Sequence, residues 1–437
     1  MIKKALFSFA MFSLVFTASA QEPCATGRYA QEMFSNVTTT SDIVYGANLN
    51  FNGSTKILKL DFYEPTGDVE PLRPLIIWVH GGSFLGGTKT DGDMVSLSNQ
   101  FAKMGYACAS IDYRTGFFPI DSANSVKAVL RAVHDLKAAV RYFYKDQADG
   151  TNTYKVDTNN IFIGGSSAGA ITALHYAYLD RTCELADYLG QTYLDQQGGT
   201  EGISGNPCYG TEVKGVINLC GALARYKWLE AGDVPFVSLH GTNDGTVGYN
   251  RQIVNPGVPL MYLDGSRMLY ERANQIGVQN PFYTFYGAGH VPHASSAQYM
   301  DTTVNFVRDF LIDQLGCTNT PLQAENAPVQ TATLYTLADC TTNTEWTACT
   351  SLGENEIMDY SFNLYPNPAV NIVNLEFASE EEVDAELIDL SGRVRIKFEK
   401  ISSGTDLNVS ELENGVYWLV VSSGMGQQRT FKLAIQK

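Results

Sequence analysis

The chain has 437 residues, of which 44% are hydrophobic and 17% are charged. This composition excludes whole-chain disorder, and the length allows two or three domains. The 30 Lys and Arg against 46 Asp and Glu give a net charge of −16, or 28 − 46 = −18 without the two lysines of a removable leader. An acidic chain is repelled by phosphate backbones and anionic lipids, which argues against nucleic-acid binding as its main role.

The first 20 residues have the pattern of a secretory signal peptide. Two lysines precede an apolar run at residues 5–16, and small residues at 18–20 allow cleavage before Gln21. A membrane anchor would need ~20 apolar residues, more than this run or any later stretch supplies. We therefore expect an exported protein without a transmembrane segment.

All eight cysteines follow the leader, and export places them in oxidising surroundings that favour disulfides. Cys108 and Cys220 lie in apolar, strand-like runs and are predicted to be buried thiols. Proximity in the sequence favours the pairs Cys340–Cys349 and Cys183–Cys208 among the other six. No C-x-x-C occurs, which argues against a zinc ribbon.

Residues 21–317 are predicted to form an α/β domain, because strand-like and helix-like segments alternate from residue 43 to residue 316. The predicted strands are Lys59–Tyr63, Leu75–Val79, Tyr106–Asp112, Ile161–Gly164, Gly215–Leu219, Pro235–His240 and Phe282–Tyr286. The predicted helices are Asn124–Gln147, Ser266–Ile276 with Gly277 as its C-terminal cap, and Ser296–Leu315. Several strands are continuous apolar runs, so we expect a mostly parallel sheet flanked by helices.

Residues 179–213 interrupt this alternation. The segment is polar and rich in glycine, with two cysteines and several tyrosines. It is either an insertion near the active site, at the carboxyl ends of the strands where ligands bind in such sheets, or a long surface loop.

The chain changes character after the α/β domain. Residues 318–360 are rich in Thr, Asn, Glu and Ala without clear periodicity and predict a linker. Residues 361–437 alternate with a period of two between turn signals, which predicts a small all-β sandwich. Its predicted strands are Ile372–Phe377, Ala385–Leu390, Val394–Phe398, Val416–Val421 and Thr430–Ile435. We expect Val416, Trp418 and Val420 to face its core.

The segment Gly165-Ser166-Ser167-Ala168-Gly169 is a G-x-S-x-G motif that follows a predicted strand and opens a helix. Such a sharp turn raises the serine hydroxyl above the sheet, and side chains at the two glycine positions would collide. The helix also directs backbone N–H groups at the reacting centre. The motif predicts Ser167 as a nucleophile, with an ordinary Gly/Ser turn as the alternative.

A nucleophilic serine needs a basic group, and among the six histidines the pattern favours His290. It ends the segment Gly287-Ala288-Gly289-His290, directly after a predicted strand, and Gly289 permits a tight loop that lets the imidazole reach Ser167. His293, three residues later, is the main rival.

The base in turn needs a carboxylate to orient it, and Asp244 is the best candidate. It lies in His240-Gly241-Thr242-Asn243-Asp244, in the loop that leaves the carboxyl end of a predicted strand. Asp233 is its rival but precedes that strand, at the wrong end of the sheet. The chain order is then nucleophile, acid, base.

A third motif, His80-Gly81-Gly82-Ser83-Phe84, follows the predicted strand Leu75–Val79. Its glycines leave backbone N–H groups free to face a developing oxyanion, and one such donor is worth ~10²–10³ in turnover. His80 is expected to brace the loop. The alternative is an ordinary glycine turn, but this motif occurs together with the two others in the right order.

Together these motifs resemble α/β-hydrolase esterases of the carboxylesterase and hormone-sensitive-lipase type, over about residues 43–316. Within that group the bacterial feruloyl and acetyl-xylan esterases are the branch most similar to the chain. The resemblance implies the α/β-hydrolase fold, with Ser167 as nucleophile, His290 as base and Asp244 as the acid that orients it.

The same resemblance implies an oxyanion hole formed by the N–H groups of Gly82, Ser83 and Ala168. Ser83 stands where many relatives have a third glycine. Only its backbone is required, so the hole should survive this difference.

The tail resembles a type A sorting domain of type IX secretion, over residues 361–437. The similarity rests on Leu364-Tyr365-Pro366-Asn367-Pro368-Ala369, Leu387-Ile388-Asp389-Leu390-Ser391-Gly392, Gly415-Val416-Tyr417 and the terminal Lys432-Leu433-Ala434-Ile435-Gln436-Lys437. It implies a Bacteroidota-type bacterium, the type IX machinery as a partner, and export through the periplasm and outer membrane to the surface or the medium.

We therefore expect a secreted carboxylic-ester hydrolase that acts on an ester substrate and needs no cofactor or metal, since no nucleotide motif or ligand cluster occurs. One alternative is a serine peptidase of the prolyl-oligopeptidase kind, for which residues 21–42 are too few to form the N-terminal propeller. Another is a non-catalytic binding protein on a hydrolase scaffold, which usually lacks one member of the triad.

Overall fold

The computed structural model describes residues 23–186, 188–317, 332–337, 362–377, 382–389, 393–423 and 428–437. The chain divides into two compact units, residues 1–346 and 347–437, and each has a hydrophobic core of its own. The predicted leader and the predicted pair Cys340–Cys349 lie outside the described residues. None of the described helices combines the length and the apolar character that crossing a bilayer requires.

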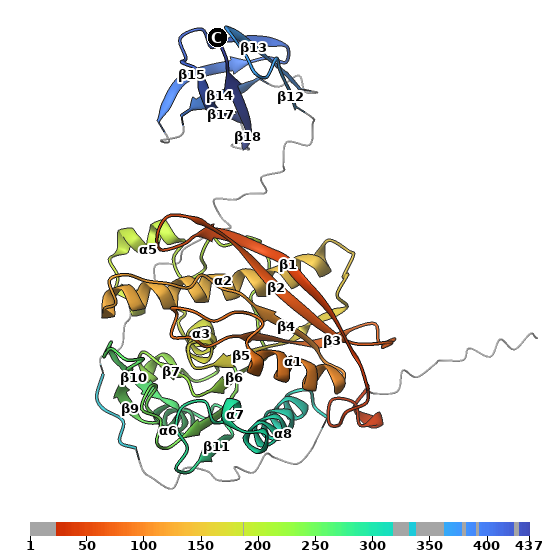
Figure 1. Cartoon of the computed structure of the whole chain (residues 1–437), viewed down its shortest axis with the longest axis vertical. Coiled ribbons are helices and arrows are strands. Elements are labelled where there is room, and N and C mark those ends of the chain that lie inside the picture. The colour runs from red at the N-terminus through yellow and green to blue at the C-terminus, as the bar shows by residue number, and fades with distance from the viewer. Residues whose placement is uncertain are drawn as a thin grey trace, which may run out of the picture. The chain divides into compact units, whose positions relative to one another are not determined.

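The first unit is built on one eight-stranded sheet (Figure 1). From edge to edge its strands are β1 (Val37–Leu49), β2 (Thr55–Pro65), β4 (Ala107–Ile111), β3 (Arg73–Val79), β5 (Val156–Ser166), β6 (Gly215–Leu219), β8 (Phe236–Gly241) and β11 (Phe282–Phe285). The strands from β4 to β11 are parallel, whereas β2 is antiparallel to both of its neighbours. The predicted mostly parallel sheet is confirmed.

Helices cover both faces of this sheet. They are α1 (Gly92–Lys103) and α8 (Ala297–Gln314) on one face, and α2 (Ser122–Ala148), α3 (Ala168–Tyr178) and α6 (Ser266–Ile276) on the other. Strand β3 is apolar throughout because both of its faces are covered. Trp78 packs on the α1 side and Ile77 on the α2 side, and both are fully buried. Helix α6 ends, as predicted, at Gly277, whose φ of 79° is left-handed.

Strand β1 and helix α1 are the two long elements of the first unit that were not predicted. Strand β1 is an edge strand in which Tyr45 alone is fully buried, so its sequence lacks the alternation of a half-buried strand. Helix α1 does carry a helical apolar pattern, since Met94, Leu97 and Phe101 are buried on one face. The sequence of β1 therefore gave no signal of a strand, whereas helix α1 could have been predicted from its apolar residues.

Short elements complete the unit. They are η1 (Pro23–Thr26), α4 (Thr182–Ala186), α5 (Gln191–Gln197), η2 (Tyr226–Trp228), α7 (Pro292–Ser295) and a small sheet of β7 (Ala222–Leu223), β10 (Tyr262–Gly265) and β9 (Arg251–Ile253). Residues 332–337, inside the predicted linker, pack against the core of this unit and run beside β9 and β10 in Figure 1.

The second unit consists of two antiparallel sheets around one core. Their strands are β12 (Phe362–Tyr365), β13 (Ile372–Phe377) and β16 (Thr405–Asn408) in one sheet, and β15 (Val394–Ile401), β14 (Val383–Ile388), β17 (Gly415–Ser423) and β18 (Gln428–Ile435) in the other. Side chains of both sheets share that core, as expected of a small β sandwich.

The predicted core face of β17 is wrong. Trp418 is exposed, whereas Tyr417 and Leu419 are buried. Residues 416–421 are all apolar or aromatic, so period-two alternation could not distinguish the two faces, and a shift of one residue exchanges them.

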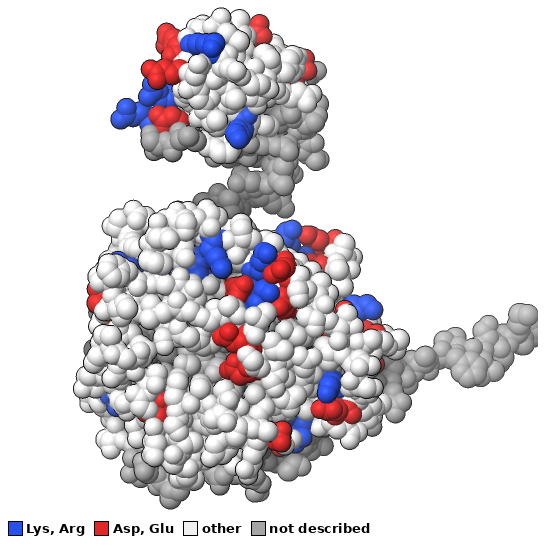
Figure 2. Space-filling model, in the orientation of Figure 1, with Lys and Arg blue, Asp and Glu red and all other residues white. Residues whose placement is uncertain are grey.

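Charged side chains are sparse on the face drawn in Figure 2, and most Lys and Arg there adjoin Asp or Glu. The described residues of this face therefore form no extended patch of a single sign. That arrangement agrees with the low charged fraction of 17%.

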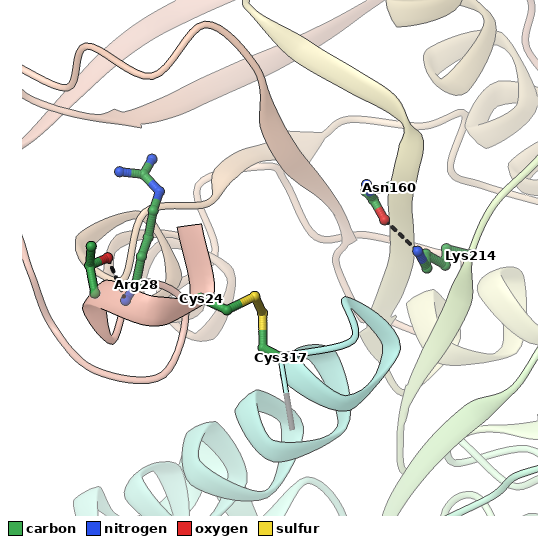
Figure 3. The surroundings of a disulfide bond; sticks show 6 residues. Cys24, Arg28, Asn160, Lys214 and Cys317 are labelled. Atoms are coloured by element: carbon green, nitrogen blue, oxygen red, sulfur yellow. Dashed lines mark hydrogen bonds between the residues drawn. A yellow bond between two sulfur atoms is a disulfide. The ribbon is translucent and has the colours of Figure 1, made fainter. Parts of the chain in front are cut away.

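A disulfide joins Cys24 in η1 to Cys317, directly after α8 (Figure 3). The two cysteines are 293 residues apart in the sequence. Cys183 is also disulfide-bonded and Cys208 is a thiol, so the predicted pair Cys183–Cys208 is wrong. Cys108 and Cys220 are buried thiols, as predicted.

Replacing both Cys24 and Cys317 with alanine should lower the free energy of unfolding by about 2–5 kcal/mol, because the cross-link no longer restricts the unfolded chain. Urea unfolding without reductant measures this. The matched control is Cys208→Ala, which removes an exposed thiol and should change stability by less than ~0.5 kcal/mol. Equal losses in the two proteins would contradict the role of the disulfide.

Candidate active site

Ser167 lies in the turn between β5 and α3, with φ 55° and ψ −115°. This is a strained conformation for a residue with a side chain, as in the elbow that presents a nucleophile. A Cβ atom built at Gly165 would lie 2.3 Å from the Val79 carbonyl oxygen, and one at Gly169 would lie 1.9 Å from it. The collisions predicted for the two motif positions are therefore present.

The structure brings together the three side chains expected to react. His290 Nε2 lies 2.7 Å from Ser167 Oγ, and His290 Nδ1 lies 2.6 Å from Asp244 Oδ2. Asp244 follows β8 and His290 follows β11, at the carboxyl ends of neighbouring parallel strands. The rival Asp233 precedes β8 and accepts a hydrogen bond from the N–H of Glu230.

Asp244 is held by other groups besides His290. Its Oδ1 accepts the N–H groups of Thr246 and Val247, both at 2.9 Å, and His240 Nε2 lies 3.1 Å from its Oδ2. Burial alone would raise the pKa of this carboxyl, but hydrogen bonds from His240 and His290 outweigh it and hold the pKa well below its usual range. Asp244 is therefore a carboxylate at neutral pH.

His240 was not assigned a role from the sequence, yet it supports the acid. Its Nε2 faces two acceptors, Asp244 Oδ2 and the Val247 carbonyl at 2.9 Å, so that nitrogen carries a proton. Its Nδ1 lies 2.7 Å from Ser266 Oγ. His240 lies at the end of a predicted strand, just before the loop that carries Asp244, and this place in the sequence could have identified its supporting role.

Among the described residues, Cys220, His240 and Asp244 form one group with metal-binding atoms within 4.8 Å of one another. Burial raises the pKa of the Cys220 thiol to about 12, so the sulfur stays protonated. His240 is hydrogen-bonded through both ring nitrogens. Within this group, His240 supports Asp244, whereas the Cys220 thiol contacts the Leu239 carbonyl oxygen.

The loop after β3 has an unusual backbone. Gly82, Ser83 and Phe84 have φ values of 105°, 57° and 60° in succession. Within residues 23–186 and 188–317, no hydrogen bond engages the N–H groups of Gly82, Ser83 or Ala168. Ser83 and Ala168 line the same cavity as Ser167, so these two residues lie close to the Ser167 side chain.

His80 braces this loop from inside. It is 1% exposed, stacks on Tyr113 with ring centroids 4.3 Å apart, and its Nδ1 lies 2.7 Å from the Gly81 carbonyl. A Cβ at Gly87 would lie 2.3 Å from the same Nδ1, so the loop closes tightly over the ring.

The family model BD-FAE matches residues 60–201, and that of the secretion system C-terminal sorting domain matches residues 363–436. The chain carries a BD-FAE esterase-type domain and a C-terminal sorting domain. It is therefore a carboxylesterase-type hydrolase of the α/β-hydrolase fold, secreted by the type IX route to the cell surface or the medium of Bacteroidota. No curated protein matches it significantly.

Several solved structures are similar to this esterase. Esterase 2 of Thermogutta terrifontis phosphorylated by paraoxon is 20% identical over 64% of this chain and 96% of that chain, with a TM-score of 0.48. The apo form of that enzyme is 19% identical over 65% and 96%, with a TM-score of 0.45. A truncated carbohydrate esterase from gut microbiota is 17% identical over 65% and 98%, with a TM-score of 0.43.

The rival base of this esterase is bonded to a different serine. His293, on α7, is 2% exposed, and its Nε2 lies 3.1 Å from Ser166 Oγ and 3.4 Å from Asp93 Oδ2. Burial alone would raise the pKa of Asp93, but bonds from His293, the Met94 N–H and Ser166 outweigh it and lower the pKa. This cluster joins α1, the elbow and the loop of His290.

A cavity of about 60 Å³ begins at Ser167 in the esterase. It lies between one face of α2 and one face of α3, because its lining recurs at helical spacing on both. The α2 residues are Ser125, Val126, Val129 and Leu130, and the α3 side supplies Ala168, Ile171, His175 and Leu179. Leu179, Leu185 and Tyr188 of the segment 179–213 also line it.

The cavity walls are mostly apolar, and among the residues that the structure describes no Asp, Glu, Lys or Arg lines them. Burial lowers the pKa of His175 to about 4, so its imidazole is neutral at physiological pH. Both ring nitrogens are engaged: Nδ1 with the Ile171 carbonyl and Nε2 with the Ala224 N–H. Ser125 donates its hydroxyl to the Ser122 carbonyl. The cavity therefore suits an apolar group.

Proposed function

We propose that Ser167, His290 and Asp244 form the catalytic triad of a carboxylic-ester hydrolase that works through an acyl-enzyme. The observation that carries the proposal is the continuous chain of contacts from Ser167 Oγ through His290 to Asp244, at 2.7 Å and 2.6 Å. The chemistry needs these three groups in this order, because a serine hydroxyl is a weak nucleophile until a base removes its proton.

In the first step His290 Nε2 takes the Ser167 proton while Oγ forms a bond to the ester carbonyl carbon. The carbonyl π electrons move to oxygen, and the N–H groups of Gly82, Ser83 and Ala168 stabilise that oxyanion. Asp244 stabilises the imidazolium through the Nδ1 hydrogen bond. The unengaged N–H groups around the nucleophile support this assignment.

When the intermediate collapses, His290 gives its proton to the alcohol oxygen and the C–O bond breaks. The alcohol leaves and the acyl group stays on Ser167. Water then repeats the sequence: His290 takes a proton from it, the acyl carbon is attacked, and the acid is released as Oγ regains its proton.

The cavity suits the acyl part of the ester. His290 must reach the leaving alcohol oxygen, so the alcohol lies on the side of His290. The cavity is lined by Ser83, Ala168 and Ser167 but not by His290. It therefore lies on the other side of the reacting carbon, where the acyl group remains after the alcohol has left.

Replacing Ser167 with alanine should lower kcat by several powers of ten, because the residual rate comes only from binding and the oxyanion donors. A fluorophosphonate probe should label Ser167 in the parent protein, and mass spectrometry of peptides locates the label. Ser166→Ala is the matched control and should keep the label at residue 167. Labelling of Ser166, or full activity of Ser167→Ala, would refute the triad.

Asp244→Asn should cost up to ~10⁴ in kcat, because the carboxylate no longer holds the productive tautomer. A depressed pKa contributes stability that is present above the unfolded value of ~3.9 and lost as pH falls below it. The thermal midpoint of this variant should therefore fall more at pH 7 than at pH 3.

Asp233→Asn is the control for that change. Burial raises the pKa of Asp233 to about 6, so its carboxylate is destabilising at pH 7 and its loss should cost neither turnover nor stability there. If Asp233→Asn is the variant that loses turnover, Asp244 is not the acid.

Deleting residues 361–437 should leave a folded esterase with near-normal kinetics, because the second unit has its own core. In a host with type IX secretion the same deletion should trap the enzyme in the periplasm. Cell fractionation with full-length and truncated chains measures this. Normal surface delivery of the truncated chain would contradict a sorting role, and loss of binding to insoluble substrate would indicate an adhesive one.

A further inference from the structure

Residues 332–337, hereafter the strap, are bound to the esterase unit although the sequence predicts a linker there. Its apolar side chains are partly buried and pack against the main core; they are Ala332, Leu334, Tyr335 and Leu337. These contacts place a segment that follows α8 in the chain on the side of the small sheet formed by β7, β10 and β9 (Figure 1).

Tyr335 makes the strongest contacts of the strap. Its hydroxyl donates to Asp264 Oδ2 at 2.7 Å and accepts from Arg251 Nη1 at 2.6 Å. The Arg251 guanidinium also lies 4.2 Å from the centre of the Tyr335 ring and 2.9 Å from Asp264 Oδ1. Asp264 is fully buried, so each partner of its charge matters.

The backbone of the strap is bound as well. Tyr226 donates its hydroxyl to the Tyr335 carbonyl, and Lys227 donates to the Leu337 carbonyl. The rings of Tyr226 and Tyr335 meet edge to face, 5.1 Å apart. The N–H of Tyr226 in turn donates to Asp264 Oδ2 at 2.8 Å. The strap, η2 and β10 therefore share one carboxylate.

Two walls of the cavity adjoin this carboxylate. Leu263, next to Asp264 on β10, lines the cavity, and so does Trp228, two residues after Tyr226 on η2. No residue of the strap lines the cavity itself. The strap can therefore influence the bound acyl group only through the positions of these walls.

We propose that the strap sets the acyl specificity of the esterase, with Tyr335 as a positioning residue that holds Leu263 and Trp228 against the acyl chain of an apolar ester. The inference rests on the proposed function, because it takes the cavity as the acyl site. A longer acyl chain occupies more of the cavity than acetate and so makes more contacts with its walls, and the strap should therefore matter more for longer chains. Loss of contact with one methylene in an apolar pocket is worth about tenfold or more in kcat/KM.

The test compares kcat/KM for p-nitrophenyl hexanoate and p-nitrophenyl acetate in the full-length chain. Tyr335→Ala should lower the hexanoate-to-acetate ratio about tenfold, and Tyr335→Phe, which keeps the ring and removes only the hydroxyl bridge, should lower it less. Tyr209→Phe is the matched control, since its hydroxyl bonds to Asp149 on the surface, and its ratio should equal that of the parent.

Hydrogen exchange gives a second measurement that does not depend on turnover. If docking of the strap strengthens the binding of an acyl group in the cavity, an acyl group in the cavity must stabilise the docked strap by the same free energy. A hexylphosphonate bound covalently to Ser167 should therefore slow exchange in a peptide containing residues 332–337 more than a methylphosphonate does.

The outcomes are distinguishable. If the Ser167→Ala variant still hydrolyses the esters, the proposed function is wrong. The strap proposal fails by itself if hydrolysis depends on Ser167 while Tyr335→Ala lowers only the thermal midpoint and leaves the hexanoate-to-acetate ratio unchanged. Equal exchange with the hexyl and methyl adducts would overturn it as well.

Discussion

The active site depends on one close approach of two backbones. Helix α3 begins so near the end of β3 that a Cβ at Gly169 would lie 1.9 Å from the Val79 carbonyl oxygen. Because the chain leaves Val79 directly into the loop of Gly82 and Ser83, the same approach brings the loop donors and the first N–H of α3 to one point. Any side chain at residue 169 would move α3, together with Ser167 and the N–H group of Ala168, away from the loop of Gly82 and Ser83.

Sequence patterns were sufficient to predict the strands and helices whose apolar residues follow a regular, local pattern of burial. Strand β6 and helix α6 have the predicted bounds, since an apolar run and a helical face with a glycine cap each depend on local chemistry alone. The candidate triad was accessible for a related reason. Parallel strands end at one edge of a sheet, so residues just beyond three strand ends can be expected to meet there.

Contacts that are set by the whole fold could not be predicted from local patterns. Gly289 favoured His290 over His293 as the partner of Ser167, but no local pattern indicated that His293 would contact Ser166 instead. Trp418 lies on a strand that is apolar on both faces, so alternation carried no information. Tyr335 stands in a segment without periodicity, and its role depends on a buried carboxylate distant in the sequence.

The bond between Cys24 and Cys317 turns the esterase unit into a covalent ring. A secreted enzyme meets proteases, and in a linear chain one cut in an exposed loop lets the two pieces separate once they unfold. In the ring, a single cut anywhere between these two cysteines only opens it, and both pieces remain one molecule that can refold as a unit. The cross-link thus makes the catalytic body tolerant of a first cleavage.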